Sequence, residues 1–127
     1  MKKPVSEETV IQFFKEHWDR PSVIRELSTS GLIVHWPWGQ STTGADKIAS
    51  SLEKNRNRED YISPKVIFDD IFSYGDRVAF RFHAITPDPN GRNISKDEIG
   101  IARMIGEKIA EIWVSWDRQY LSEQKES

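Results

Sequence analysis

Residues able to carry chemistry gather in two short stretches of this sequence of 127 residues. The first is VHWPWGQ at residues 34–40, in which His35 stands beside Trp36 and Trp38 at the end of a predicted strand. A tryptophan brings a large apolar surface and one N–H group, and a histidine changes its charge close to neutral pH. The second is KIAEIWVSWD at residues 108–117, which mixes carboxylates with bulky apolar side chains. Together they have the chemistry to hold a flat ligand and to move a proton.

The composition excludes several other kinds of chemistry. There is no cysteine, so disulfides, thiolate zinc sites and thiol nucleophiles are ruled out. The three histidines lack metal-ligand spacing and no glycine-rich phosphate loop is present, so we expect no metal and no cofactor. The 18 basic and 20 acidic residues are interspersed, so we expect no nucleic-acid partner. No apolar run has membrane-spanning length and the start lacks a signal-peptide core, so we expect a cytoplasmic protein without membrane contact.

The first half of the chain predicts three helices. Apolar residues recur at helical spacing between residues 10 and 18, and Ser6 is expected to cap this helix. His17 falls near its end, where a role in capping or in the helix dipole is the simplest interpretation. A short second helix is expected over residues 21–27, and a third over residues 44–55 with Thr43 as its cap.

The strands follow mainly in the second half. A short buried strand is expected over residues 32–36, ended by a proline. Two hairpins are expected over residues 65–85 and 95–117, and a proline- and glycine-rich loop joins them. Helices first and a long antiparallel meander second indicate an α+β domain with helices on one face of the sheet. We find no internal repeat or boundary, so residues 1–127 form one domain, with a polar tail at residues 119–127.

The alternation of side chains in the last hairpin predicts its two faces. A two-residue turn would pair Met104 with Ile109 and place Glu111 and Trp113 opposite the small Ala102 and Gly100. Small residues opposite large or polar ones leave a hollow, so this face is expected to border a pocket. The other face is aliphatic, and because all helices are used on the pocket side, we expect a second copy to cover it in a homodimer. Its residues are Ile99, Ile101, Ile112, Val114 and Trp116.

The closing hairpin RMIGEKIAEIWVSWD resembles that of the SnoaL-like, polyketide cyclase-like group in the nuclear transport factor two-like superfamily. A glycine-glutamate turn at residues 106 and 107 replaces the Asp-Gly turn of the group. With GDRVAFRF and LIVHWPWG, the resemblance covers about residues 6–118. It implies a cone-shaped α+β fold, in which N-terminal helices pack on a strongly curved antiparallel sheet around a cavity. The residues that match the signature are Arg103, Lys108, Ile109, Glu111, Trp113 and Asp117.

The resemblance also implies two candidate acid–base carboxylates. Asp117 would act on a carbon acid from the end of the last strand, and its alternative is a surface ion pair with Lys96. Glu111 lies deeper, where it would either act in the same way or form a structural ion pair with Arg81 or Arg103. No choice between these alternatives follows from the sequence.

Histidines and aromatic residues complete the candidate site. His35 and His83 would either meet across the cavity and orient an oxygen, or serve as hydrogen-bonded wall residues. Trp36 and Trp38 would be the wall and lip of a site for a flat apolar ligand, or else cover the seam between helices and sheet. The residues expected to contact the ligand are Phe14, Trp18, Trp36, Trp38 and Trp113.

Two kinds of function therefore stay open. One is a cofactor-free cyclase, isomerase or dehydratase that acts on a small aromatic or polyketide-like molecule. The other is a module of the same fold that binds an apolar or aromatic small molecule without chemistry, or a dimeric scaffold. The sequence argues against two activities of the superfamily. Residues 38–40 offer no base for a ketosteroid isomerase. An epoxide hydrolase would need an Asp-Arg-Asp set, of which this sequence has only Arg81.

Overall fold

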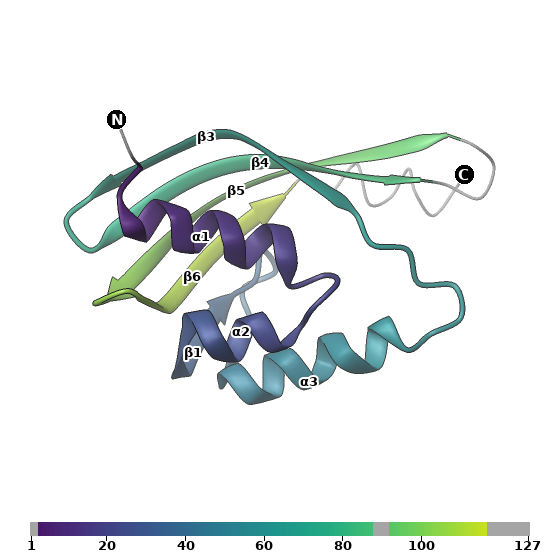
Figure 1. Ribbon diagram of the computed structural model, residues 1–127, viewed down its shortest axis with the longest axis horizontal. Coiled ribbons are helices and arrows are strands. Elements are labelled where there is room, and N and C mark those ends of the chain that lie inside the picture. The colour runs from purple at the N-terminus through teal and green to yellow at the C-terminus, as the bar shows by residue number, and fades with distance from the viewer. Residues whose placement is uncertain (1–2, 88–91, 117–127) are drawn as a thin grey trace.

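Three helices and six strands make up the computed structural model, which describes residues 3–87 and 92–116 (Figure 1). All six strands join one sheet in the order β2-β1-β6-β5-β4-β3. The helices are α1 (Val5–Glu16), α2 (Ser22–Leu27) and α3 (Ala45–Arg56). The strands are β1 (Ser28–His35), β2 (Ser41–Thr43), β3 (Lys65–Tyr74), β4 (Arg77–Pro87), β5 (Asn93–Ile105) and β6 (Lys108–Trp116).

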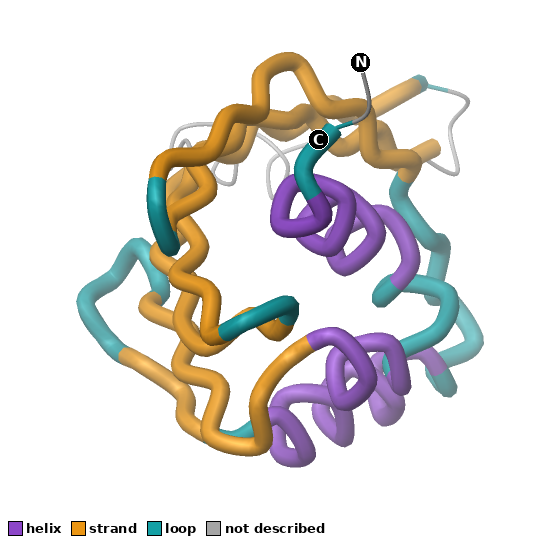
Figure 2. Tube along the Cα trace, turned by 60° about the vertical axis from the view of Figure 1, so that its left-hand side comes forward, coloured by secondary structure: helices purple, strands orange, loops and turns teal. Residues whose placement is uncertain are grey.

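The sheet curves around one side of the helices (Figure 2). α1 packs against β3, β4 and β6, while α2 and α3 pack against each other and against β1. The centre of the core is aromatic: the ring of Phe14 lies 4.8 Å from that of Phe80 and 5.2 Å from that of Phe82. The predicted α+β fold, with helices on the inner face of a curved sheet, is confirmed.

The sheet is mixed, because one parallel pair stands beside the antiparallel strands. β1 runs parallel to β6, whereas every other neighbouring pair is antiparallel. The long connection between β1 and β6 contains α3 and four strands, and a parallel pair needs a long connection of this kind. This pairing brings the end of β1, with its histidine and tryptophans, beside the last strand.

Both predicted helix caps are wrong. α1 begins at Val5 with Pro4 at the N-cap position, which places Ser6 inside the first turn, and no side chain caps the helix. Thr43 belongs to β2, and Gly44 stands at the N-cap of α3. The Gly44 N–H donates to a β1 carbonyl at 2.7 Å, so the chain passes directly from sheet pairing into the helix.

A β-bulge in the last hairpin reverses the predicted faces of β6. Met104 pairs with Ile109 as expected, but Arg103 pairs with Glu111, which leaves Ala110 as an extra residue. A shift of one residue turns every later side chain of the strand to the opposite face. The prediction that Glu111 shares a hollow with the helices is therefore wrong. The side chains that face the helices are Ile112, Val114 and Trp116, and those that face away are Glu111, Trp113 and Ser115.

Gly100 of β5 allows three strands to approach closely. A Cβ atom at this position would lie 2.4 Å from the carbonyl oxygen of Trp113 and 2.6 Å from Cζ of Phe80. The space expected to be hollow beside this small residue is therefore filled by a β4 ring and by β6 backbone. No side chain fits there without movement of the strands.

Gly100→Ala is expected to lower the free energy of unfolding by about 1–3 kcal/mol, the usual cost of overpacking a core. Urea unfolding followed by tryptophan fluorescence measures this loss. Gly31→Ala is the matched control, because nothing lies within 4 Å of a Cβ at that strand position. The control should change stability by less than about 0.5 kcal/mol. Equal stability of the two variants would contradict the close approach at Gly100.

Candidate functional site

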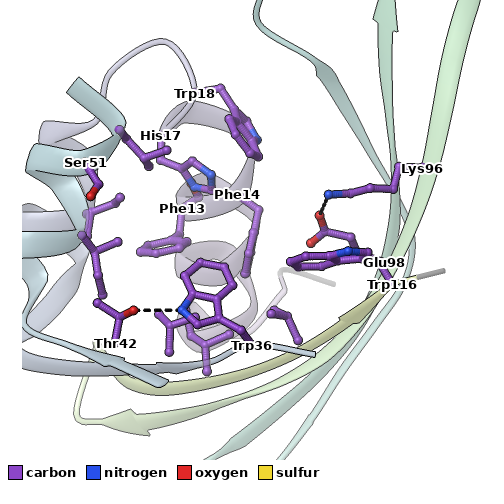
Figure 3. A pocket seen from close by; sticks show the side chains of 16 residues that line it. Phe13, Phe14, His17, Trp18, Trp36, Thr42, Ser51, Lys96, Glu98 and Trp116 are labelled. Atoms are coloured by element: carbon purple, nitrogen blue, oxygen red, sulfur yellow. Dashed lines mark hydrogen bonds and ion pairs between the residues drawn. The ribbon is translucent and has the colours of Figure 1, made fainter. Parts of the chain in front are cut away.

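A pocket of about 210 Å³ lies between the helices and the inner face of the sheet (Figure 3). Phe14 of α1 and Trp18, just after the end of α1, form part of its wall, and Trp36 closes it from the end of β1. Ile112 and Val114 from β6 line the opposite side. Its surface is mostly apolar, which suits a flat ligand with little charge.

Glu98 of β5 brings a carboxylate into this apolar pocket. Its side chain is only 7% exposed, and Oε1 lies 2.9 Å from the ammonium of Lys96. The same ammonium stands 4.2 Å from the ring centre of Trp116, in a cation–π contact. A buried carboxylate next to one cation and aromatic walls is the arrangement expected of an acid–base or anchoring group. The alternation of β5 places Glu98 on the pocket face, but no sequence motif marks it, so sequence reasoning did not single it out.

His17 is the second polar group of the pocket. Its ring is buried and Nδ1 lies 2.8 Å from the carbonyl oxygen of Phe13, one turn earlier in α1. A carbonyl only accepts, so Nδ1 carries the proton of the ring. Burial lowers the pKa of His17 to about 4, which keeps the imidazole neutral at pH 7. The sequence indicated only a helix-end role, because its burial depends on the sheet that curves over α1.

Three tryptophans form the mouth of the pocket. Trp36 lines it and donates its indole N–H to Thr42 Oγ1 at 2.9 Å. Trp38 stacks on the outer side of Trp36, with ring centres 5.6 Å apart, and is 51% exposed. Trp116 meets both rings edge-on. Trp36 thus occupies the wall and Trp38 the rim, and the latter is not among the residues that line the pocket.

His35 and Glu111 lie together on the outer face of the sheet. Nε2 of His35 donates to Oε2 of Glu111 at 2.5 Å, and Arg103 donates to Oε1 at 3.0 Å. The hydrogen bond from His35, aided by Arg103, lowers the pKa of Glu111. The ring of Trp113 stacks on His35 at 5.1 Å. This geometry matches the structural alternative for Glu111, an ion pair with Arg103, and it places Trp113 outside the pocket.

His83, another predicted catalytic residue, does not enter the pocket either. His83 lies on the outer face of β4, where Nδ1 is 2.9 Å from Asp69 Oδ2. β5 and β6 separate its strand from β1, so His83 and His35 do not meet across a cavity as one interpretation required. Asp117 lies outside the described residues.

Residues 3–87 and 92–116 hold no group of three or more metal-ligating side chains. None of the helices in these ranges has both the length and the apolar content needed to cross a membrane.

The sequence matches the family of SnoaL-like polyketide cyclases over residues 8–125. The chain belongs to this family. No curated protein matches the sequence significantly.

Solved structures of similar shape support the assignment of the fold. A putative polyketide cyclase from Acidithiobacillus ferrooxidans has a TM-score of 0.78 at 16% identity, covering 98% of this chain and 96% of its own. The putative polyketide cyclase IdmH from Streptomyces antibioticus has a TM-score of 0.76 at 17% identity, covering 96% and 99%. TerC, co-crystallised with polyporic acid, has a TM-score of 0.78 at 16% identity, covering 98% and 100%. At these identities the comparisons show the fold alone.

The buried histidine of this SnoaL-like protein predicts a specific loss of stability in acid. The pKa of His17 is about 4 in the folded chain and 6.5 in its ordinary state, so the unfolded chain binds more protons between these values. Stability therefore rises with pH through this window and is lost as the pH falls from 6.5 to 4. Between pH 7 and pH 4, the wild type should lose about 3 kcal/mol more free energy of unfolding than His17→Phe.

Urea unfolding of both proteins at several pH values measures this difference. His17→Phe keeps a ring of similar size, and the backbone N–H of residue 17 still donates to the carbonyl of Phe13. Carboxylates titrate in both proteins, so only the difference between the two curves reports His17. Parallel curves would contradict the neutral, buried state of this histidine.

Proposed function

We propose that this SnoaL-like protein binds a flat, apolar or aromatic small molecule in its pocket, and that Glu98 acts on that molecule as a general acid–base group. The observation that carries the proposal is the buried carboxylate of Glu98 among apolar and aromatic walls. Family membership supports the same class of ligand, since the matching family is one of polyketide cyclases. The co-crystallisation of the similarly folded TerC with polyporic acid is compatible with it.

The chemistry proposed for Glu98 is proton transfer at a carbon next to a carbonyl group. Lys96 contacts Oε1, so Oε2 is the oxygen that takes the proton. The electron pair of the broken C–H bond moves onto the carbonyl oxygen and gives an enolate, whose charge the ammonium of Lys96 stabilises. Return of the proton at another carbon completes an isomerisation. Attack of the enolate carbon on a second carbonyl gives an alkoxide, which takes the proton back from Glu98 and completes a cyclisation. Neither reaction needs a cofactor.

A second candidate function is binding without chemistry. The ion pair between Lys96 and Glu98 supports it, because a carboxylate held by a cation is a weaker base and a good anchor. In this case the same aromatic walls hold the ligand, and the pair fixes its orientation.

Proton exchange in 2-tetralone separates the two candidates. This flat bicyclic ketone has acidic C–H groups beside its carbonyl, and its exchange in D₂O is followed by NMR. An acid–base role predicts exchange that saturates with ketone concentration and falls by about 100-fold or more in Glu98→Gln. Glu107→Gln, in the exposed turn between β5 and β6, is the matched control and should exchange like the wild type. Saturable binding without exchange would support the binding function instead.

We also propose that two copies associate through the outer face of the sheet. All three helices lie on the inner side, and the described structure has no element over the outer face. A monomer rarely leaves so large an apolar surface in water, and a two-fold contact would bury the same residues on both copies. The Ile112, Val114 and Trp116 side chains that were expected in this contact face the pocket instead. Large apolar residues exposed on this face are Phe72, Tyr74, Ile99 and Ile101.

Sedimentation tests this association. The wild type should sediment at twice the chain mass at micromolar concentration. Ile101→Glu should sediment as a monomer, because it buries a charge at the centre of the contact. Ile62→Glu changes an equally exposed isoleucine outside the sheet and should stay dimeric. A monomeric wild type, or a dimeric Ile101→Glu variant, would contradict the proposed interface.

A further inference from the structure

We infer that His17 accepts a hydrogen bond from a hydroxyl group of the bound molecule, so that the ligand is a flat aromatic compound bearing a hydroxyl opposite the group that meets Glu98. This inference deepens the proposed function and rests on it, because it concerns the same pocket.

The first step is the fixed tautomer of the ring. Nδ1 lies 2.8 Å from the Phe13 carbonyl oxygen. Because a carbonyl oxygen only accepts hydrogen bonds, Nδ1 must carry the proton of the ring. The same carbonyl oxygen also accepts the backbone N–H of His17 at 3.2 Å. Donation from Nδ1 fixes the tautomer and leaves Nε2 with a lone pair and no proton.

The second step is the direction of that lone pair. The rings of Phe13, Phe14 and Trp18 surround the imidazole at centre distances of 5.3, 5.8 and 4.5 Å. His17 nonetheless lines the pocket, and Figure 3 shows its ring turned toward the pocket interior. Nε2 makes no hydrogen bond with the side chains of the described residues. A lone pair that faces the pocket can accept a hydrogen bond from a donor on the ligand.

The third step is the charge of the ring and of the groups that face it. Burial lowers the pKa of His17 to about 4, so Nε2 acts as an acceptor and not as a donor at neutral pH. The charged groups that line the same pocket are Glu98 and Lys96, which come from the sheet on the opposite wall (Figure 3). The ion pair of Lys96 and Glu98 is suited to bind a carbonyl or enolate oxygen of the ligand, whereas Nε2 of His17 is suited to accept a hydrogen bond from a donor on the ligand. An ether or carbonyl at the His17 end would leave two acceptors facing each other.

A pair of matched probes tests this selection. 6-Hydroxy-2-tetralone and 6-methoxy-2-tetralone share one ring system, and only the first has a donor opposite its ketone. Their dissociation constants are measured by quenching of the tryptophans that line the pocket. The wild type should bind the hydroxy compound about five- to tenfold more tightly, the usual effect of one hydrogen bond between neutral groups. His17→Phe should bind the two compounds within about twofold of each other.

Two further variants locate the hydrogen bond. His17→Gln keeps an acceptor oxygen and should retain part of the preference for the hydroxy compound. It also keeps the test available if His17→Phe folds poorly. Glu98→Gln should keep the full preference for the hydroxy compound. Equal binding of both probes by the wild type, a preference that survives in His17→Phe, or a preference lost only in Glu98→Gln would each overturn the inference. Saturable binding of neither probe would contradict the proposed binding function itself, whereas equal binding of both would leave that function standing.

Discussion

The single extra residue in β6 decides what the pocket contains. Without the bulge at Ala110, Glu111 and Trp113 would face the helices, and the inner wall would carry a carboxylate opposite Ala102. With it, the inner wall of β6 consists of Ile112, Val114 and Trp116, while the charged residues face outward. Because side chains alternate along a strand, one inserted residue exchanges a polar wall for an apolar one. The chemistry of the pocket therefore depends on this local feature of the backbone more than on the family signature.

The bulge also divides the charged groups between the two faces of the sheet. On the outer face, Glu111 is held by His35 and Arg103, and its lowered pKa reflects a carboxylate with its partners already in place. On the inner face, Glu98 has one cation beside it and an apolar pocket in front of it. A carboxylate with two strong partners is suited to structure, and one with a single partner keeps an oxygen for a ligand. The number of partners separates the two glutamates more clearly than their burial does.

The sequence predicted the architecture well and the site poorly, for physical reasons that differ between residues. Helical spacing and paired turns located the helices and both hairpins, since these signals are local. The bulge leaves no mark in a pattern of period two, because side chains alternate along β6 in either register and the alternation does not say which set faces the helices. Alternation along β5 puts Glu98 on the same face as Gly100 and Ala102, but nothing local distinguishes a buried carboxylate from a solvated one. His17 was assigned to the helix end, and only the curvature of the distant sheet makes it part of the pocket.

The two polar ends of the pocket limit each other's roles. His17 is already committed through Nδ1 to the Phe13 carbonyl, so it has one lone pair to offer and no proton to give. Glu98 is committed through Oε1 to Lys96, so it likewise has one free oxygen. In the proposed function, proton transfer within the pocket therefore begins and ends at Glu98, and the proposed role of His17 is to fix the position of the ligand along the pocket axis. A neutral histidine suits this task better than a charged one, because an imidazolium would attract the Glu98 carboxylate and weaken it as a base. Burial thus makes His17 costly to protonate and keeps it neutral. Lys96 is then the cationic neighbour of Glu98 in the pocket.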